Sequence, residues 1–154
     1  MRVGVIDGAA SRELRRRVLR PNLGPDDPLP GDDLAGGVHL GAVDDDGAVV
    51  GTCFIYPDPC YWRTDGTDAW HLRQMATAPE RQGRGIGSAV VAAVVEYLGR
   101  IDVPLVWCHA REEAVEFYAR HGFIGFGDIF LDEHHPVPHL RMSRELSAPA
   151  TSSG

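Results

Sequence analysis

The residues best suited to bind a ligand are the glycines of Gln82-Gly83-Arg84-Gly85-Ile86-Gly87. They follow a strand-like stretch and open a helix-like one. Glycine permits positive φ and lets a backbone approach a ligand closely. The N–H groups and the dipole of a helix start favour an anion, and Arg81 and Arg84 add positive charge. The pattern predicts a phosphate or pyrophosphate site at this loop.

Two common phosphate-binding motifs fit the loop poorly. The dinucleotide fingerprint requires glycine at its first, third and sixth positions, and the sixth position counted from Gly83 is Ser88. The P-loop requires Gly-Lys-Ser/Thr, and the loop contains no lysine. The spacing and the expected strand order therefore disfavour a Rossmann oxidoreductase.

The loop resembles the (Gln/Arg)-x-x-Gly-x-(Gly/Ala) pyrophosphate loop of the GCN5-related N-acetyltransferase (GNAT) family. Residues 72–80, Leu-Arg-Gln-Met-Ala-Thr-Ala-Pro-Glu, are similar to the strand and turn that precede that loop. Residues 114–123, Ala-Val-Glu-Phe-Tyr-Ala-Arg-His-Gly-Phe, are similar to the family's A-(I/V)-x-F-Y-x-x-x-G-F helix end. The resemblance covers roughly residues 68–131 and is diffuse before them.

The resemblance implies an enzyme that transfers acetyl from acetyl-CoA to a primary amine of an unidentified small molecule or peptide. Transfer would be direct, within a ternary complex. A non-catalytic acyl-CoA-binding or regulatory module with the same fold is the alternative. The residues implied in cofactor binding are Met75, Ala76, Thr77, Arg81, Gln82, Gly83, Arg84, Gly85, Ile86, Gly87, Ser88, Arg111 and Tyr118.

Tyr118 occupies the position from which the family's tyrosine protonates the leaving thiolate. A phenol, neutral at pH 7, is a suitable acid there; the other interpretation is an ordinary core tyrosine. His71 falls where the histone-acetylating branch carries its glutamate base, and imidazole has a suitable pKa. It could equally be a surface or core residue. His109 and Glu80 are weaker candidates, and many relatives use no dedicated base.

Some expected contacts depart from the family pattern or have competing explanations. Arg111 stands where many relatives carry a cofactor-contacting asparagine; it would grip a phosphate or simply be solvated. Pro138-His139-Leu140-Arg141-Met142 is similar to the P-H-x-x-M ending of ElaA-like bacterial proteins, which would place His139 in the acceptor pocket. The arginines of the first helix are either a solvated face or an acceptor-site border. The implied acceptor-binding residues are Arg17, Arg20, His109 and His139.

Composition narrows the class of protein. The chain has 154 residues and a net charge of −7, which argues against general nucleic-acid binding. No apolar run is long enough to span a membrane and no secretory signal is visible, so we expect a cytoplasmic monomer or homodimer. The three cysteines lack a CxxC pattern, and we expect them to be reduced and mostly buried. Pro136 and Pro138 separate His139 from the adjacent His134 and His135, which leaves no fixed ligand spacing, so no metal is expected.

These residues require a mixed α/β (α+β) fold to position them. Strands are expected at 3–6, 38–43, 49–56, 70–77, 104–109, 123–131 and 137–146, with helices at about 7–20, 85–98 and 111–121. Residues 21–37 are expected to form a loop, long enough to act as a lid. We therefore predict one GNAT-like domain over 1–146, with about six to seven strands and three to four helices, and a disordered tail at 147–154.

Overall fold

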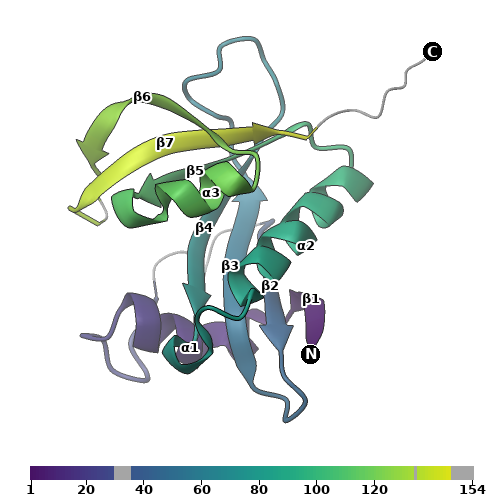
Figure 1. The fold of residues 1–154 in the computed structure, drawn as a ribbon, viewed down its shortest axis with the longest axis vertical. Helices are drawn as coiled ribbons and strands as arrows, with labels where there is room; N and C mark the ends of the chain where they lie inside the picture. The colour runs from purple at the N-terminus through teal and green to yellow at the C-terminus, as the bar shows by residue number, and fades with distance from the viewer. Residues whose placement is uncertain (30–35, 134, 147–154) are drawn as a thin grey trace. The chain divides into compact units, whose positions relative to one another are not determined.

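The computed structural model describes residues 1–29, 36–133 and 135–146, and within them the chain forms seven strands and three α-helices. The strands lie in one mixed sheet in the order β1-β2-β3-β4-β5-β7-β6. The strands are β1 Arg2–Ile6, β2 Val38–Val43, β3 Val49–Pro57, β4 Trp70–Thr77, β5 Leu105–Arg111, β6 Ile124–Leu131 and β7 Pro138–Glu145. The helices are α1 Gly8–Leu19, α2 Ile86–Arg100 and α3 Val115–Arg120 (Figure 1).

The chain forms two compact units. The first comprises Met1–Pro57 and Leu72–Tyr97, and the second comprises Asp58–His71 and the described residues from Leu98 onward. Strand β4 contributes to both units, because its first two residues belong to the second unit and the rest to the first.

In the first unit, β1, β2 and β3 pair antiparallel. Helix α1 begins where the Asp7 carboxylate accepts a hydrogen bond from the N–H of Ala9 at 3.0 Å, a normal N-cap contact that satisfies one free donor. Helix α2 packs closely on β3: a Cβ added at Gly51 would lie 2.5 Å from the Ile86 side chain. The apolar side chains of Ile86, Val90, Val91 and Val94 on this helix are buried.

In the second unit, β5 and β7 pair antiparallel over their whole length, and β6 pairs with the other side of β7. The start of β4 pairs parallel with β5 through Trp70↔Val106 and His71↔Trp107. Figure 1 shows β6 and β7 as a curved pair. The unit's core includes Cys60, Ala69, Leu105 and Trp107, with Trp62 packed against them.

The main correction concerns the helix predicted over 111–121. Arg111 is instead the last residue of β5, residues 112–114 form a 3₁₀ turn, and α3 covers only Val115–Arg120. Sequence pattern misplaced this start because no side-chain N-cap is present to mark it. The C-terminal end was predicted correctly, since Gly122 has φ +84° and follows the last helical turn. The tail 147–154 and residues 30–35 of the expected lid lie outside the described residues.

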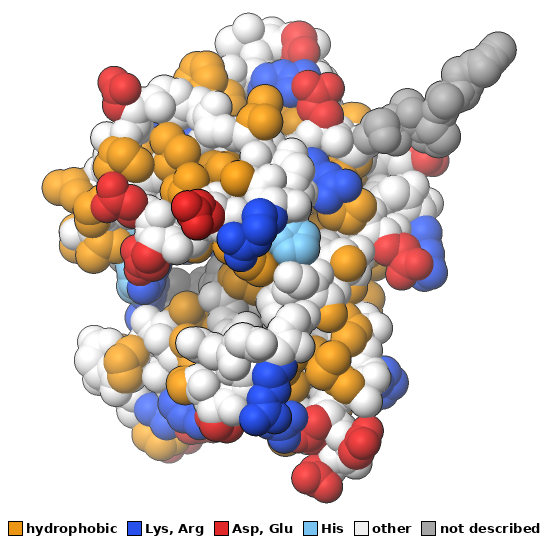
Figure 2. Space-filling model, viewed as in Figure 1, with side chains coloured by type: hydrophobic (Ala, Val, Ile, Leu, Met, Phe, Trp, Pro, Cys, Tyr) orange, Lys and Arg blue, Asp and Glu red, His pale blue; other side chains and the backbone are white. Residues whose placement is uncertain are grey.

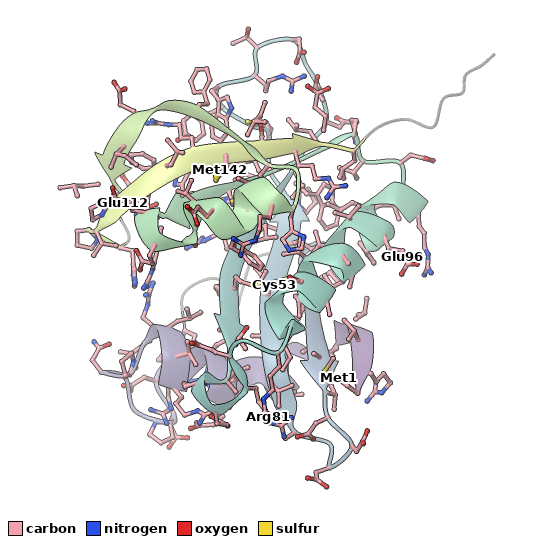
Figure 3. All side chains as sticks on the ribbon, in the orientation of Figure 1. Met1, Cys53, Arg81, Glu96, Glu112 and Met142 are labelled. Carbon is pink, nitrogen blue, oxygen red and sulfur yellow. The ribbon has the colours of Figure 1, made fainter. Side chains whose placement is uncertain are left out.

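Composition also set expectations for the cysteines, and the structure describes all three. All three cysteines are free and buried; Cys53, which lies on β3, is labelled in Figure 3. No helix in those residues is long and apolar enough to cross a membrane. The face of the molecule drawn in Figure 2 carries acidic and basic side chains interspersed, with no continuous basic face.

Candidate functional site

The glycine loop has the backbone geometry that its sequence predicts. Gly83 and Gly85 adopt φ +80° and +79°, a left-handed conformation that disfavours residues with a Cβ. A Cβ at either position would meet no atom within 4 Å, so conformation and not crowding explains the glycines. The loop leads directly into α2, where the N–H of Ala89 donates to the Gly85 carbonyl at 3.0 Å. The N–H groups at the start of a helix point outward along its axis, which suits an anion. This arrangement can hold an anion through backbone groups.

The two arginines that flank the glycines differ in their surroundings. Arg81 ends a short 3₁₀ helix, Pro79–Arg81, and its Nη2 donates to Asp44 Oδ2 at 2.7 Å. Asp44 belongs to the β2–β3 turn, and its pKa is lowered mainly by hydrogen bonds from the Ala48 and Asp46 N–H groups and also by Arg81. Arg81, labelled in Figure 3, therefore ties the loop to this turn, whereas Arg84 is exposed.

Strand β4 contains an irregularity that sequence reasoning missed. Gln74 has φ +59°, which is unusual for a residue with a side chain and breaks the regular alternation of the strand just before Met75. Ala76 is buried, and Met75 and Thr77 are half-buried. A positive φ inside a strand is a local irregularity of the kind found at bulges, and such irregularities occur often beside binding sites.

The Gln74 side chain is held by a buried arginine of α1. Arg15 is only 2% exposed, and its guanidinium donates to Gln74 Oε1 at 3.1 Å. It also donates to Ser11 Oγ and to the Gly8 carbonyl, each at 3.0 Å. Buried charges persist where such hydrogen bonds satisfy them. The sequence presented Arg15 only as one member of an arginine-rich helix, with no signal that set it apart.

Tyr118, the predicted acid, lies in α3 and is 5% exposed. Its ring packs edge-on against Phe117 and Phe123, with centroids 5.2 Å apart in each pair. Both a catalytic phenol and a core tyrosine are compatible with this burial.

His71, the predicted base, is held in place on two sides. It is 8% exposed, and its ring stacks on Trp107 with centroids 3.7 Å apart and planes 15° apart. Its Nδ1 lies 3.3 Å from Asp58 Oδ2. The Asp58 carbonyl also accepts a hydrogen bond from the Trp107 indole at 2.9 Å. The loop after β3 therefore orients both rings.

His109 takes part in a more extended network than His71. Its Nδ1 lies 2.8 Å from Asp132 Oδ2, and its Nε2 lies 2.8 Å from the Tyr61 hydroxyl. The Nε of Arg141 donates to the same hydroxyl, also at 2.8 Å. Burial lowers the pKa of His109, and Asp132 only partly opposes this effect. Tyr61, Asp132 and Arg141 were not predicted as site residues.

Arg111 and His139 face each other across β5 and β7, where they are paired in register. The Arg111 guanidinium is hydrogen-bonded to Nε2 of His135. His139 is buried, and its Nδ1 donates to the Val137 carbonyl at 2.7 Å. Among the described residues no group of three or more His, Cys, Asp or Glu side chains is arranged to hold a metal ion, and His134 lies outside them.

The remaining predicted residues lie on the surface of the first unit. Arg17 and Glu80 form an exposed ion pair at 3.5 Å. The pKa of Glu80 is lowered, first by a backbone hydrogen bond and then by Arg17, which makes this carboxylate a weak base. Arg20 follows α1 and donates to the Leu19 carbonyl at 3.2 Å. The structure thus gathers the predicted cofactor loop and residues 75–77 in one unit, and the three histidines, Arg111 and Tyr118 in the other.

Comparison with known proteins agrees with this architecture. The family model for the Acetyltransferase (GNAT) family matches residues 12–123. An uncharacterized N-acetyltransferase of Bacillus subtilis, YitI, is 31% identical over 119 residues, which cover 77% of this chain and 78% of that protein.

Solved structures share the fold at lower identity. An aminoglycoside 6′-N-acetyltransferase complexed with coenzyme A has a TM-score of 0.77 at 14% identity, covering 97% of this chain and 99% of that one. Escherichia coli ElaA has a TM-score of 0.70 at 20% identity, covering 94% of this chain and 97% of its own. The family match, the curated relative and the seven-stranded fold together show that this chain belongs to the GNAT acetyltransferase family.

Proposed function

We propose that the protein is an acetyl-CoA-dependent N-acetyltransferase that acts on a primary amine of a small molecule or peptide. The observation that carries the proposal is the pair of left-handed glycines, Gly83 and Gly85, at the start of α2. Backbone N–H groups of residues 83–88 would bind the pyrophosphate, aided by Arg84. Arg81 would act mainly by fixing the loop through Asp44.

Residues 75–77 would hold the pantetheine arm and the acetyl carbonyl. The positive φ of Gln74 supports this role because it is an irregularity in the strand directly before these residues, of a kind often found beside binding sites. An N–H directed at the carbonyl oxygen stabilises the oxyanion that forms when the amine attacks.

The cysteines favour direct transfer over an acyl-enzyme. An acyl-cysteine would need a thiolate, which is the nucleophilic form. Burial raises the pKa of Cys53 to about 12 and raises the pKa of Cys108 further still. The pKa of Cys60 is raised as well, again mainly by burial. All three thiols therefore stay protonated at neutral pH, and the amine would attack the thioester itself.

Tyr118 would protonate the departing thiolate, and a histidine of the second unit would accept the amine proton. His71 is oriented by Asp58, as a base should be, and remains the candidate predicted from the sequence. Arg17, Arg20, His109 and His139 are proposed to border the acceptor, and Arg111 to contact the cofactor.

Calorimetry with coenzyme A and acetyl-CoA tests the binding part of the proposal. Thiol release from acetyl-CoA, measured with lysine, spermidine, kanamycin and a peptide with a free N-terminus, tests transfer. Binding together with amine-dependent thiol release is expected. Binding without release to any amine would favour a non-catalytic acyl-CoA-binding module, and the absence of binding would overturn both.

A further inference from the structure

The second unit contains a continuous chain of hydrogen-bonded side chains. It joins Asp132, His109, Tyr61 and Arg141, and it includes the accessible hydroxyl of Tyr61. The chain runs from the Asp132 carboxylate to His109 Nδ1, and from His109 Nε2 to Tyr61 Oη, each step 2.8 Å long. Arg141 Nε completes it with a third contact to Tyr61 Oη, also 2.8 Å. Asp132 and His109 are largely buried, whereas Tyr61 is 54% exposed.

The partners determine which proton lies where. The Asp132 carboxylate can only accept, so Nδ1 of His109 carries the hydrogen and Nε2 is left as an acceptor. Tyr61 must then donate its own hydrogen to Nε2, because Arg141 Nε is a donor and needs the phenol oxygen as its acceptor. One lone pair of that oxygen remains for an incoming N–H group.

The surroundings keep His109 neutral and fix the Tyr61 ring. Burial lowers the pKa of His109, and the charges of Arg141 and His139 lower it further against the opposing effect of Asp132. His71 faces the same ring with centroids 5.9 Å apart. Tyr61 packs edge-on against Trp62 and Trp107, with centroids 5.0 and 5.6 Å apart. The hydroxyl is therefore held in position even though it belongs to a loop.

We propose that Tyr61 is a catalytic residue that takes the proton from the acceptor nitrogen and passes its own proton to His109, with Asp132 and Arg141 as positioning residues. This inference rests on the proposed acetyl transfer and identifies its base. As the nitrogen attacks the thioester carbon, the C–N bond forms and the nitrogen becomes acidic. Its proton moves to Tyr61 Oη while the phenol proton moves to His109 Nε2. The imidazolium is stabilised by Asp132, and the later loss of thiolate breaks the C–S bond.

The relay through His109 provides a more accessible base than His71 does. The ring of His71 is covered by Trp107, and the residue is 8% exposed. The relay instead carries basicity from a buried imidazole to a hydroxyl that a bulky acceptor can reach. Arg141 adds a positive charge beside the oxygen, which stabilises it when its proton is displaced; its guanidinium is itself fixed 4.2 Å from the centre of the Phe130 ring.

A kinetic experiment on the intact protein tests the relay. The variants are Tyr61→Phe, His109→Gln, Asp132→Asn and, for the competing base, His71→Gln. His121→Gln is the matched control because the pKa of His121 is also lowered by burial. With the amines of the panel above, we expect Tyr61→Phe and His109→Gln to lose about 10²-fold in kcat, with the KM for acetyl-CoA little changed. They should also lose the acidic limb of the kcat/KM profile, which His121→Gln should keep. Retention of the limb in His109→Gln, or its loss only in His71→Gln, would overturn the relay.

A second measurement does not depend on turnover. Nitrogen-15 NMR of the histidines in the wild-type protein should show His109 with its hydrogen on Nδ1 and Nε2 as an acceptor. Tyr61→Phe should shift the Nε2 resonance, and Asp132→Asn should disturb the tautomer. A His109 with its hydrogen on Nε2 refutes the relay even if amines are acetylated. Conversely, the expected tautomer without coenzyme A binding leaves the hydrogen-bond chain intact while the proposed function fails.

Discussion

Tyr118 has the most direct expected effect of any single side chain. Tyr118→Phe removes the proposed acid but keeps the ring that packs on Phe117 and Phe123. We expect kcat to fall by about 10²- to 10⁴-fold while acetyl-CoA affinity stays the same. Steady-state thiol release and calorimetry measure the two quantities. Tyr97→Phe, which alters a phenol of α2, is the control; unchanged turnover in Tyr118→Phe would assign Tyr118 to the core.

Arg15 and Gln74 provide a second test at this scale. Arg15→Met removes the buried guanidinium together with its hydrogen bonds to Ser11, Gln74 and Gly8, and leaves these partners unsatisfied. It should lower the free energy of unfolding by roughly 2–3 kcal/mol. It should also weaken acetyl-CoA binding, because Gln74 loses the contact that supports its positive φ.

A double variant separates the two effects. In Arg15→Met/Gln74→Gly, glycine adopts the left-handed conformation without support. Acetyl-CoA affinity should recover in part while the stability lost with Arg15 does not. If the double variant binds no better than Arg15→Met, the arginine has no role in shaping β4.

At the scale of elements, the glycine loop determines how α2 begins, and this can be tested by substitution. Gly85→Ala places a Cβ on a left-handed residue, which costs roughly 1–2 kcal/mol, and should displace the start of α2. Coenzyme A affinity should fall at least tenfold by calorimetry. Gly66→Ala is the matched control, since Gly66 has φ +79° and equally open surroundings in a loop of the other unit. Equal affinities in the two variants would contradict the role of this loop.

The elements show what a single sequence can and cannot reveal. Local signals were enough for the glycines of the loop, which adopt positive φ, and for the helical residues 86–98 of α2, because each depends on neighbours in the chain. The start of α3 was misjudged for want of a capping side chain. Gln74 was predicted to be an ordinary strand residue, because nothing in its neighbours indicates a positive φ and its partner Arg15 lies 59 residues away.

In the candidate site, too, single residues could be predicted from the sequence but contacts between distant residues could not. The sequence identified His71, His109 and Tyr118 as individual candidates, since imidazoles and phenols are recognisable by type. It gave no means of joining Tyr61 to His109, 48 residues apart, or His109 to Asp132. Such contacts arise only when the loop after β3 and the end of β6 meet β5. Arg141 belongs to the motif at residues 138–142, but its contact with Tyr61 joins positions 80 residues apart and could not be predicted from that motif.

At the scale of the whole molecule, buried histidines make stability depend on pH. Burial lowers the pKa values of His109 and His121 below the ordinary value of 6.5. The unfolded chain therefore binds more protons than the folded chain as pH falls through 6.5 toward those lowered values. The free energy of unfolding should therefore decrease as the pH falls through this window. Above the window, the contribution of these two histidines to stability is complete.

Urea denaturation at pH 5.5 and pH 7.5 checks this dependence. His121→Gln should reduce the difference between the two pH values, since glutamine does not titrate. A stability that is the same at both pH values in the wild type would show that these side chains are not protected from protonation.

The three buried thiols can also serve as native probes of local opening of the structure. An alkylating reagent reaches Cys53 only when the first unit opens, and Cys60 or Cys108 only when the second one does. Mass spectrometry of labelled peptides then gives a separate opening rate for each unit, without any introduced probe. If coenzyme A binds the first unit, as proposed, it should slow the modification of Cys53, so that ligand binding can be followed at a native side chain.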